Sequence, residues 1–142
     1  MFSLFRKKRF SDEDKAKFVD AIADMLRIQL IPVGDRSVET DAGLNKKAVG
    51  YVYGFIDAAL RTIGQDMGDE SLGVPIAWQV FRKVFPGKED RCVEFLVENL
   101  AQDEIAMRGA MHGGQQYMDF NNGKLRTPMG LARCIIEADS EN

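Results

Sequence analysis

The sequence predicts an all-α fold, a compact single-domain bundle of five or six helices with no significant sheet. Apolar residues recur at three- and four-residue steps along most of the chain, which is the period of an amphipathic helix. No segment alternates apolar and polar residues for long enough to indicate a strand. A length of 142 residues, with 45% hydrophobic and 29% charged residues, fits one globular domain with a buried core.

The first helix is expected to begin at Ser11, because Asp14 follows at the third position and the two form a capping-box-like start. One face of this helix is apolar from Phe18 to Leu30. The helix should end before Pro32, which disfavours helical geometry at the residue before it. Residues 32–43 contain few apolar side chains and indicate a long surface connection.

The second helix is expected from Leu44 to about Met67, and it contains a ridge of small residues, Gly50, Gly54 and Ala58, at four-residue spacing. Each interior glycine costs a helix about 1 kcal/mol relative to alanine, so the ridge indicates that another backbone approaches closely. Two hypotheses follow. The ridge packs against another helix of the same chain, or it forms a self-association seam between two copies.

Residues 65–73 are polar and indicate a turn, after which Pro75 suits the first turn of a third helix. The segment that follows is apolar on nearly all sides. We therefore expect this helix at the centre of the domain, with the core formed around Trp78, Phe81 and Phe55.

A further helical stripe begins near Glu89 and continues through Met107 and Met111. A break is expected either around 101–103 or at Gly109. The stripe should end at Asn121, where asparagines and a glycine follow one another.

A last helix is expected with Thr127 as its N-cap and Pro128 at its first position. This gives a helical domain over 11–138 and an acidic, frayed tail over 139–142. Residues 1–10 are predicted to form a separate basic arm, either disordered or packed on a partner subunit.

The charge is divided unevenly along the chain. The net charge is −3, but residues 1–10 carry four cations, which leaves 15 basic against 22 acidic residues elsewhere. A mildly acidic domain does not favour nucleic acid as a partner. The apolar side chains of the arm are scattered around a helical projection, so membrane contact through residues 1–10 is not favoured either. Two cysteines in a chain of this size indicate buried thiols and a cytoplasmic location.

Motifs for chemistry are sparse. His112 is the only histidine, which excludes zinc sites that need two imidazoles, and neither a metal nor a cofactor is expected. Neither a phosphate-binding loop nor a nucleophile elbow is found. If the protein is an enzyme or a metal-dependent protein, its candidate residues are His112 and Glu104, which would lie two turns apart on one helix.

The segment from Gly109 to Phe120 is a candidate binding surface, because methionine, glutamine and aromatic side chains adapt to varied partners. Its candidate contact residues are Gln115, Tyr117 and Phe120. The leading hypothesis is a non-catalytic cytoplasmic interaction protein, acting as a homodimer, that binds another protein through this segment or its acidic helical surface. The alternatives are a helical protein that binds an apolar small molecule or lipid, and an enzyme or metal-dependent protein that uses His112 with nearby carboxylates.

Overall fold

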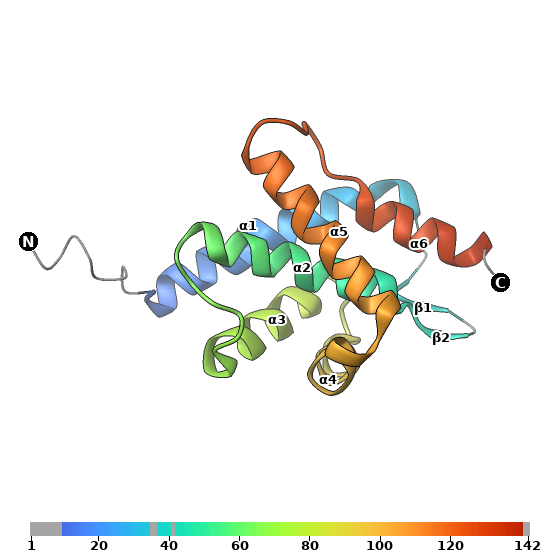
Figure 1. Cartoon of the computed structure of the whole chain (residues 1–142), viewed down its shortest axis with the longest axis horizontal. Helices are drawn as coiled ribbons and strands as arrows, with labels where there is room; N and C mark the ends of the chain where they lie inside the picture. The colour runs from blue at the N-terminus through green and yellow to red at the C-terminus, as the bar shows by residue number, and fades with distance from the viewer. Residues whose placement is uncertain (1–9, 35–36, 41, 141–142) are drawn as a thin grey trace, which may run out of the picture.

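The computed structural model describes residues 10–34, 37–40 and 42–140, and within them it confirms the predicted all-α fold (Figure 1). The described residues form six α-helices, two short 3₁₀ helices and one two-stranded hairpin. The elements are, in order, α1 (Asp12–Gln29), η2 (Ile31–Val33), β1 (Glu39–Thr40), β2 (Gly43–Leu44), α2 (Lys46–Thr62), α3 (Glu70–Val84), α4 (Glu89–Asn99), η3 (Leu100–Gln102), α5 (Glu104–Asn121) and α6 (Gly130–Ser140). None of these helices has the length and apolar character required to cross a bilayer.

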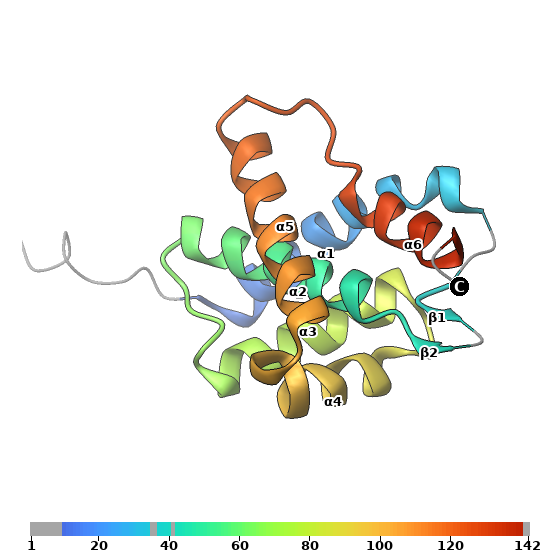
Figure 2. The ribbon, with the colours of Figure 1, turned by 45° about the vertical axis from the view of Figure 1, so that its right-hand side comes forward.

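Helices α2 and α5 pack with their backbones in direct contact, and α5 lies across α2 in both ribbon views (Figures 1 and 2). A Cβ placed on Gly50 would collide with the carbonyl oxygen of Ala106, and one on Gly54 would collide with that of Ala110. The ridge is therefore used within the chain, against α5.

Helix α5 contributes two glycines of its own to this contact. A Cβ on Gly109 would collide with the carbonyl oxygen of Lys47, and one on Gly113 would collide with that of Tyr51. Because both helices lack side chains along the contact, each backbone lies in the groove of the other. Gly109 causes no break in α5, which is continuous from Glu104 to Asn121.

The core surrounds the buried side of α2 and is completed by α1, α3 and α6. Figure 2 shows α1 and α6 above α3 and α4, with α2 running through the middle. The largest fully buried apolar side chains come from α1, α2, α3 and α6: Leu26, Tyr51, Phe55, Ile56, Leu60, Ile76, Phe81, Leu131 and Ile135.

Trp78 was expected at the centre of the domain, and this prediction is wrong. Its indole is half-buried at the margin of the core, where Nε1 donates a hydrogen bond of 2.8 Å to Asp90 Oδ1. The guanidinium of Arg82 lies 5.4 Å from the centroid of the ring. An indole buried at the centre would need a partner for its N–H, and the margin supplies one.

Helix α3 begins five residues earlier than expected, at Glu70, so Pro75 lies inside it. Asp69 is the N-cap, and its carboxylate accepts hydrogen bonds from the Ser71 N–H and hydroxyl. The proline removes the helical partner of the Ser71 carbonyl, but both residues are exposed, so water can replace that bond.

Two other boundaries agree with the sequence, whereas α2 ends at Thr62, before the expected Met67. Ser11 and Asp14 form the predicted capping box at the start of α1. The predicted break in the helical stripe that begins near Glu89 falls at η3, between α4 and α5. Asp103, which follows η3, is the N-cap of α5. The last helix starts at Gly130 instead of Pro128 and continues to Ser140, into the segment expected to be a frayed tail.

The connection over 32–43 contains η2 and β1 of the hairpin, in which Glu39 pairs with Leu44. At the N-terminus, Phe10 packs edge-on against Phe18 of α1. The rest of the predicted basic arm, residues 1–9, lies outside the described residues.

Candidate binding groove

An open apolar groove of about 1020 Å³ lies between α2, α5 and the segment formed by the end of α4 and η3. Its lining residues are Tyr53, Gly54, Asp57, Ala58, Arg61, Thr62, Leu96, Val97, Leu100, Ala101, Met107, Ala110, Met111, Gly114, Gln115 and Met118.

The floor of the groove follows from the close packing of α2 and α5. Where the two helices meet, the groove is lined by Gly54, Ala58, Ala110 and Gly114, which have a methyl group or no side chain at all. Larger residues on both sides rise above this junction. Gly54, which lets the helices approach, and Gly114 therefore leave a channel along the seam between α2 and α5.

The walls carry exposed apolar side chains from α4 and α5. Met111 is 72% exposed, Val97 62% and Met107 40%. The stripe predicted through Met107 and Met111 faces this groove and not the core, because Gly109 and Gly113 occupy the face of α5 that contacts α2. Such exposed apolar neighbours are typical of a binding surface.

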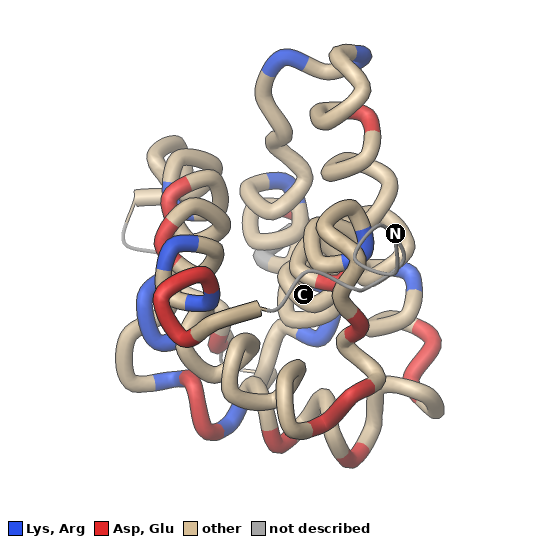
Figure 3. Tube along the Cα trace, turned by 90° about the vertical axis from the view of Figure 1, so that its left-hand side faces the viewer, with Lys and Arg blue, Asp and Glu red and all other residues tan. Residues whose placement is uncertain are grey.

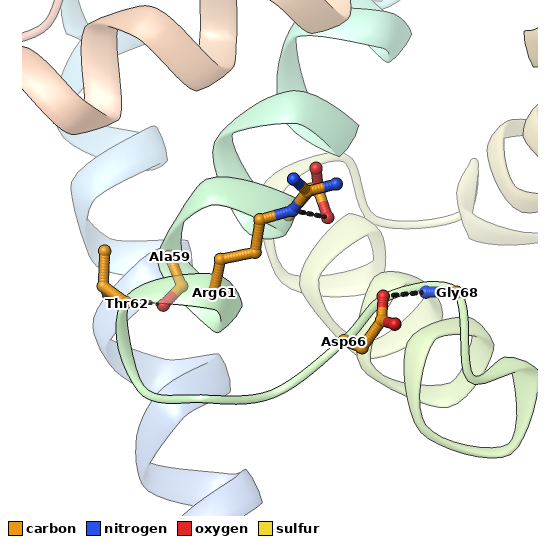
Figure 4. A network of polar contacts seen from close by, with 6 residues as sticks. Ala59, Arg61, Thr62, Asp66 and Gly68 are labelled. Carbon is orange, nitrogen blue, oxygen red and sulfur yellow. Dashed lines mark hydrogen bonds and ion pairs between the residues drawn. The ribbon is translucent and has the colours of Figure 1, made fainter.

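Three of the polar side chains that line the groove, Asp57, Arg61 and Thr62, already bond with one another or with the backbone. Arg61 Nε donates to Asp57 Oδ1 at 3.2 Å, and the Thr62 hydroxyl donates to the Ala59 carbonyl (Figure 4). Figure 4 also shows Asp66, just beyond the end of α2, accepting a hydrogen bond from the Gly68 N–H. The groove thus presents mainly apolar surface to a ligand.

Tyr53 stands where the groove meets a second, smaller pocket of about 190 Å³. This pocket lies between the start of α3 and α4 and is lined by Met67, Gly73, Ala77 and Val93 among others. Burial raises the pKa of the Tyr53 phenol, and the Asp57 carboxylate adds to this rise. A cavity of about 150 Å³ can hold a benzene ring, so the second pocket has room for one aromatic or branched side chain.

The three residues expected to form a contact surface on α5 have different positions. Gln115 lines the groove and donates to Asp119 Oδ1 at 2.9 Å. Tyr117 packs edge-on against Phe55, with ring centroids 5.2 Å apart, and is half-buried beside the core. Phe120 is 37% exposed near the end of α5 and does not line the groove.

Gly50, Gly54 and Ala58 were candidate interface residues, and α5 covers the first two. Gly54 and Ala58 do reach the groove, as part of its floor. A self-association seam would need a surface other than the Gly50 and Gly54 ridge.

The structure does not bring His112 and Glu104 together. They are eight residues apart on one continuous helix, which is about 12 Å along its axis. His112 instead packs edge-on against Tyr51, with ring centroids 5.4 Å apart. Partial burial lowers the pKa of the imidazole, and the cations Lys47 and Arg133 lower it further.

Beside His112, two glutamines from other helices cap the start of α6. Gln116 Oε1 accepts from the Gly130 N–H at 2.8 Å and from the Tyr51 hydroxyl at 2.6 Å. Gln29 Oε1, fully buried, accepts from the Leu131 N–H at 3.0 Å. These bonds take the place of the predicted Thr127 cap, which explains why α6 starts at Gly130 and not at Pro128.

Gly130 itself is required by the network. A Cβ at this position would lie 2.5 Å from a Tyr51 ring carbon and 2.9 Å from a carbon of the His112 imidazole. His112 therefore belongs to the packing that fixes α6 in place.

Within the described ranges, no group of three or more histidine, cysteine, aspartate or glutamate side chains could hold a metal ion. Cys92 and Cys134 are both free and buried. Comparison of the chain with protein-family models, with curated proteins and with solved structures gave no match in any of the three.

The sequence placed Val97 and Leu100 on the same helical stripe as Met107 and Met111. It did not show that the two pairs form opposite walls of a groove. A usable signal was present, because α5 carries small residues on one face and methionines at three- and four-residue steps on another. A helix with two separate non-polar faces buries one and leaves the other for a second contact.

Proposed function

We propose that the protein is a non-catalytic interaction protein that binds an apolar segment of another protein in the groove between α2, α4 and α5. The observation that carries this proposal is the exposure of its walls, with Met111 72% and Val97 62% exposed at the rim. Methionine side chains are flexible and polarisable, and they line surfaces that accept partner helices.

The groove favours a helical segment over an extended one. Its walls are helices, whose backbone groups are largely bonded within each helix, and its polar side chains Asp57, Arg61 and Gln115 are engaged with neighbours. An extended peptide would therefore bury backbone groups without partners. A helix satisfies its own backbone and offers only side chains.

A macromolecular partner also fits better than a small apolar ligand. Pockets for small molecules usually measure about 300–1,000 Å³ and enclose most of the ligand surface. This groove has a volume of about 1020 Å³, and its rim residue Met111 is mostly exposed, so a small ligand would keep one side in water. His112 and Glu104 do not line the groove, and the proposal gives neither of them a catalytic role.

The proposal includes a cytoplasmic location, which the two buried free thiols, Cys92 and Cys134, support. A second copy of the chain is a competing occupant of the groove, and binding and oligomerisation experiments distinguish it from another protein.

Selection from a library of random displayed peptides of about 15 residues, four helical turns, tests the proposal. Peptides with apolar residues at helical spacing should be enriched on the wild-type protein and lost on Met111→Glu, which places a charge in the groove wall. Ile31→Glu is the matched control, because Ile31 is 77% exposed and lies outside the groove. The proposal fails if no such peptides are enriched, or if they bind Met111→Glu as well as the wild type.

A further inference from the structure

The charged residues around the groove indicate the charge of its partner, which also needs an apolar face. On α4, Glu94 and Glu98 are exposed and flank the wall residue Val97. Figure 3 shows acidic residues prevailing along the lower edge of the molecule, where α3 and α4 lie. One long side of the groove is therefore bordered by negative charge.

The opposite wall is also more acidic than basic. Glu104 and Asp119 lie on the outer face of α5, at its two ends, with Arg108 between them. Inside the groove, the cation Arg61 is already paired with Asp57. Arg108 is the only lysine or arginine of α5, and it forms no ion pair among the contacts of the described residues.

We propose that the partner segment is a cationic amphipathic helix, with its apolar face in the groove and lysine or arginine residues against Glu94, Glu98 and Glu104. This inference rests on the proposed function and adds the charge of the partner. Complementary charge along the rim raises the rate of encounter and fixes the orientation of the helix, while the apolar floor supplies contact area.

The second pocket supplies an anchor point for the same helix. It shares the wall residues Tyr53, Leu96 and Val97 with the groove, so a helix lying in the groove can extend one large apolar side chain into it. Buried aromatic anchors of this kind dominate the binding energy of many interfaces. The partner is therefore expected to carry one phenylalanine or leucine whose truncation costs more than that of its neighbours.

Two synthetic helical peptides test the inference on the full chain. They share one apolar face and differ only in carrying lysine or glutamate on the flanks. Fluorescence anisotropy should give roughly tenfold tighter binding for the lysine peptide at about 0.05 M salt, and a smaller difference at about 0.5 M, because salt screens exposed charges.

Matched charge reversals then locate the effect. Glu94→Lys with Glu98→Lys should weaken binding of the lysine peptide roughly fivefold and strengthen that of the glutamate peptide. The control is Asp20→Lys with Asp24→Lys, which has the same spacing and the same change in net charge on α1, outside the groove. Equal effects of the two pairs would overturn the inference, because they would reflect net charge alone.

The outcomes separate this inference from the proposed function. If both peptides bind equally and both are lost in Met111→Glu, the groove is a binding site and the charge inference is wrong. If neither peptide binds, the proposed function falls as well. A synthetic peptide of residues 1–10 that binds more tightly than the lysine peptide, together with dimers lost in Met111→Glu, would assign the groove to a second copy and overturn the inference.

Discussion

Gly113 and Gly114 are neighbours on α5, yet the structure uses them differently. Gly113 faces α2, and a Cβ there would collide with the Tyr51 carbonyl oxygen. Gly114 faces the groove, and its Cβ would come no closer than 3.4 Å to the nearest atom, the Gly54 carbonyl oxygen. The first glycine is needed for packing, whereas the second has space for a methyl group.

We expect Gly113→Ala to lower the free energy of unfolding by about 1–3 kcal/mol, because two packed backbones would have to separate. Gly114→Ala should leave stability unchanged or raise it by up to about 1 kcal/mol, because alanine favours the helix. Urea unfolding of both variants measures the difference. Equal losses would show that the α2–α5 contact is not as close as described.

The close approach of the α2 backbone to another backbone could be predicted from the sequence, but its partner could not. The spacing of Gly50 and Gly54 predicted a close backbone approach, and the structure shows it. What covers the ridge could not be read from spacing, because a helix of the same chain and a helix of a second copy present the same small residues. The partner of the ridge is formed by Gly109 and Gly113. In the sequence, Gly109 indicated a possible helix break, and both residues belonged to the candidate binding segment.

Helix α5 has three faces, and each makes a different kind of contact. One face contacts α2 through glycines, a second carries His112 and Gln116 toward α6, and the third lines the groove with methionines. Periodicity predicts that such a helix exists, but it does not say which of several non-polar faces is buried. For this reason the helix was predicted and its groove was not.

The start of α6 shows why one helix boundary could not be predicted. Thr127 and Pro128 form a plausible local start, but the caps come from Gln29 and Gln116, which are distant in sequence. Pairings between residues so far apart leave no local pattern. Local caps, such as that of Ser11 on α1, were predicted correctly.

Substitutions at two adjacent glutamines test whether Gln116 caps the start of α6. Gln116→Leu removes the acceptor of the Gly130 N–H and one of the two acceptors of the Tyr51 hydroxyl, the other being Gln29, so we expect a loss of about 1–3 kcal/mol in the free energy of unfolding. Amide hydrogen exchange across residues 131–135 should become faster. Gln115→Leu, whose side chain bonds only to Asp119 among the contacts described, should leave exchange in α6 unchanged. If both variants behave alike, Gln116 does not hold α6.

Among the described residues, the Cys92 and Cys134 thiols and the Tyr51 phenol are buried weak acids whose neutral form is favoured. Burial raises the pKa of the Cys92 thiol to about 12 and that of the Cys134 thiol to about 11, from an ordinary value of 9.0. Burial also raises the pKa of the Tyr51 phenol. The native state therefore keeps protons that the unfolded chain releases in alkaline solution.

Stability should consequently be unaffected by these thiols below about pH 9 and should fall as pH rises toward 11 and 12. The slope is at most about 1.4 kcal/mol per pH unit for each thiol. Urea unfolding between pH 8 and 10.5, in the presence of a reductant, measures it. The variant Cys92→Ala with Cys134→Ala should show a shallower slope, and an unchanged slope would contradict the assignment.

The bond between Gln29 and Leu131 also constrains the order of events during synthesis. It joins residues 102 positions apart, at opposite ends of the domain, and it lies in the buried network around Tyr51. Until Leu131 has been made, the emerging α1 and α2 lack the helix that covers them, and the apolar surface around Tyr51 stays open to water. Folding of this domain is therefore completed only when nearly all of it has been translated, and the unfinished chain is the form most exposed to aggregation.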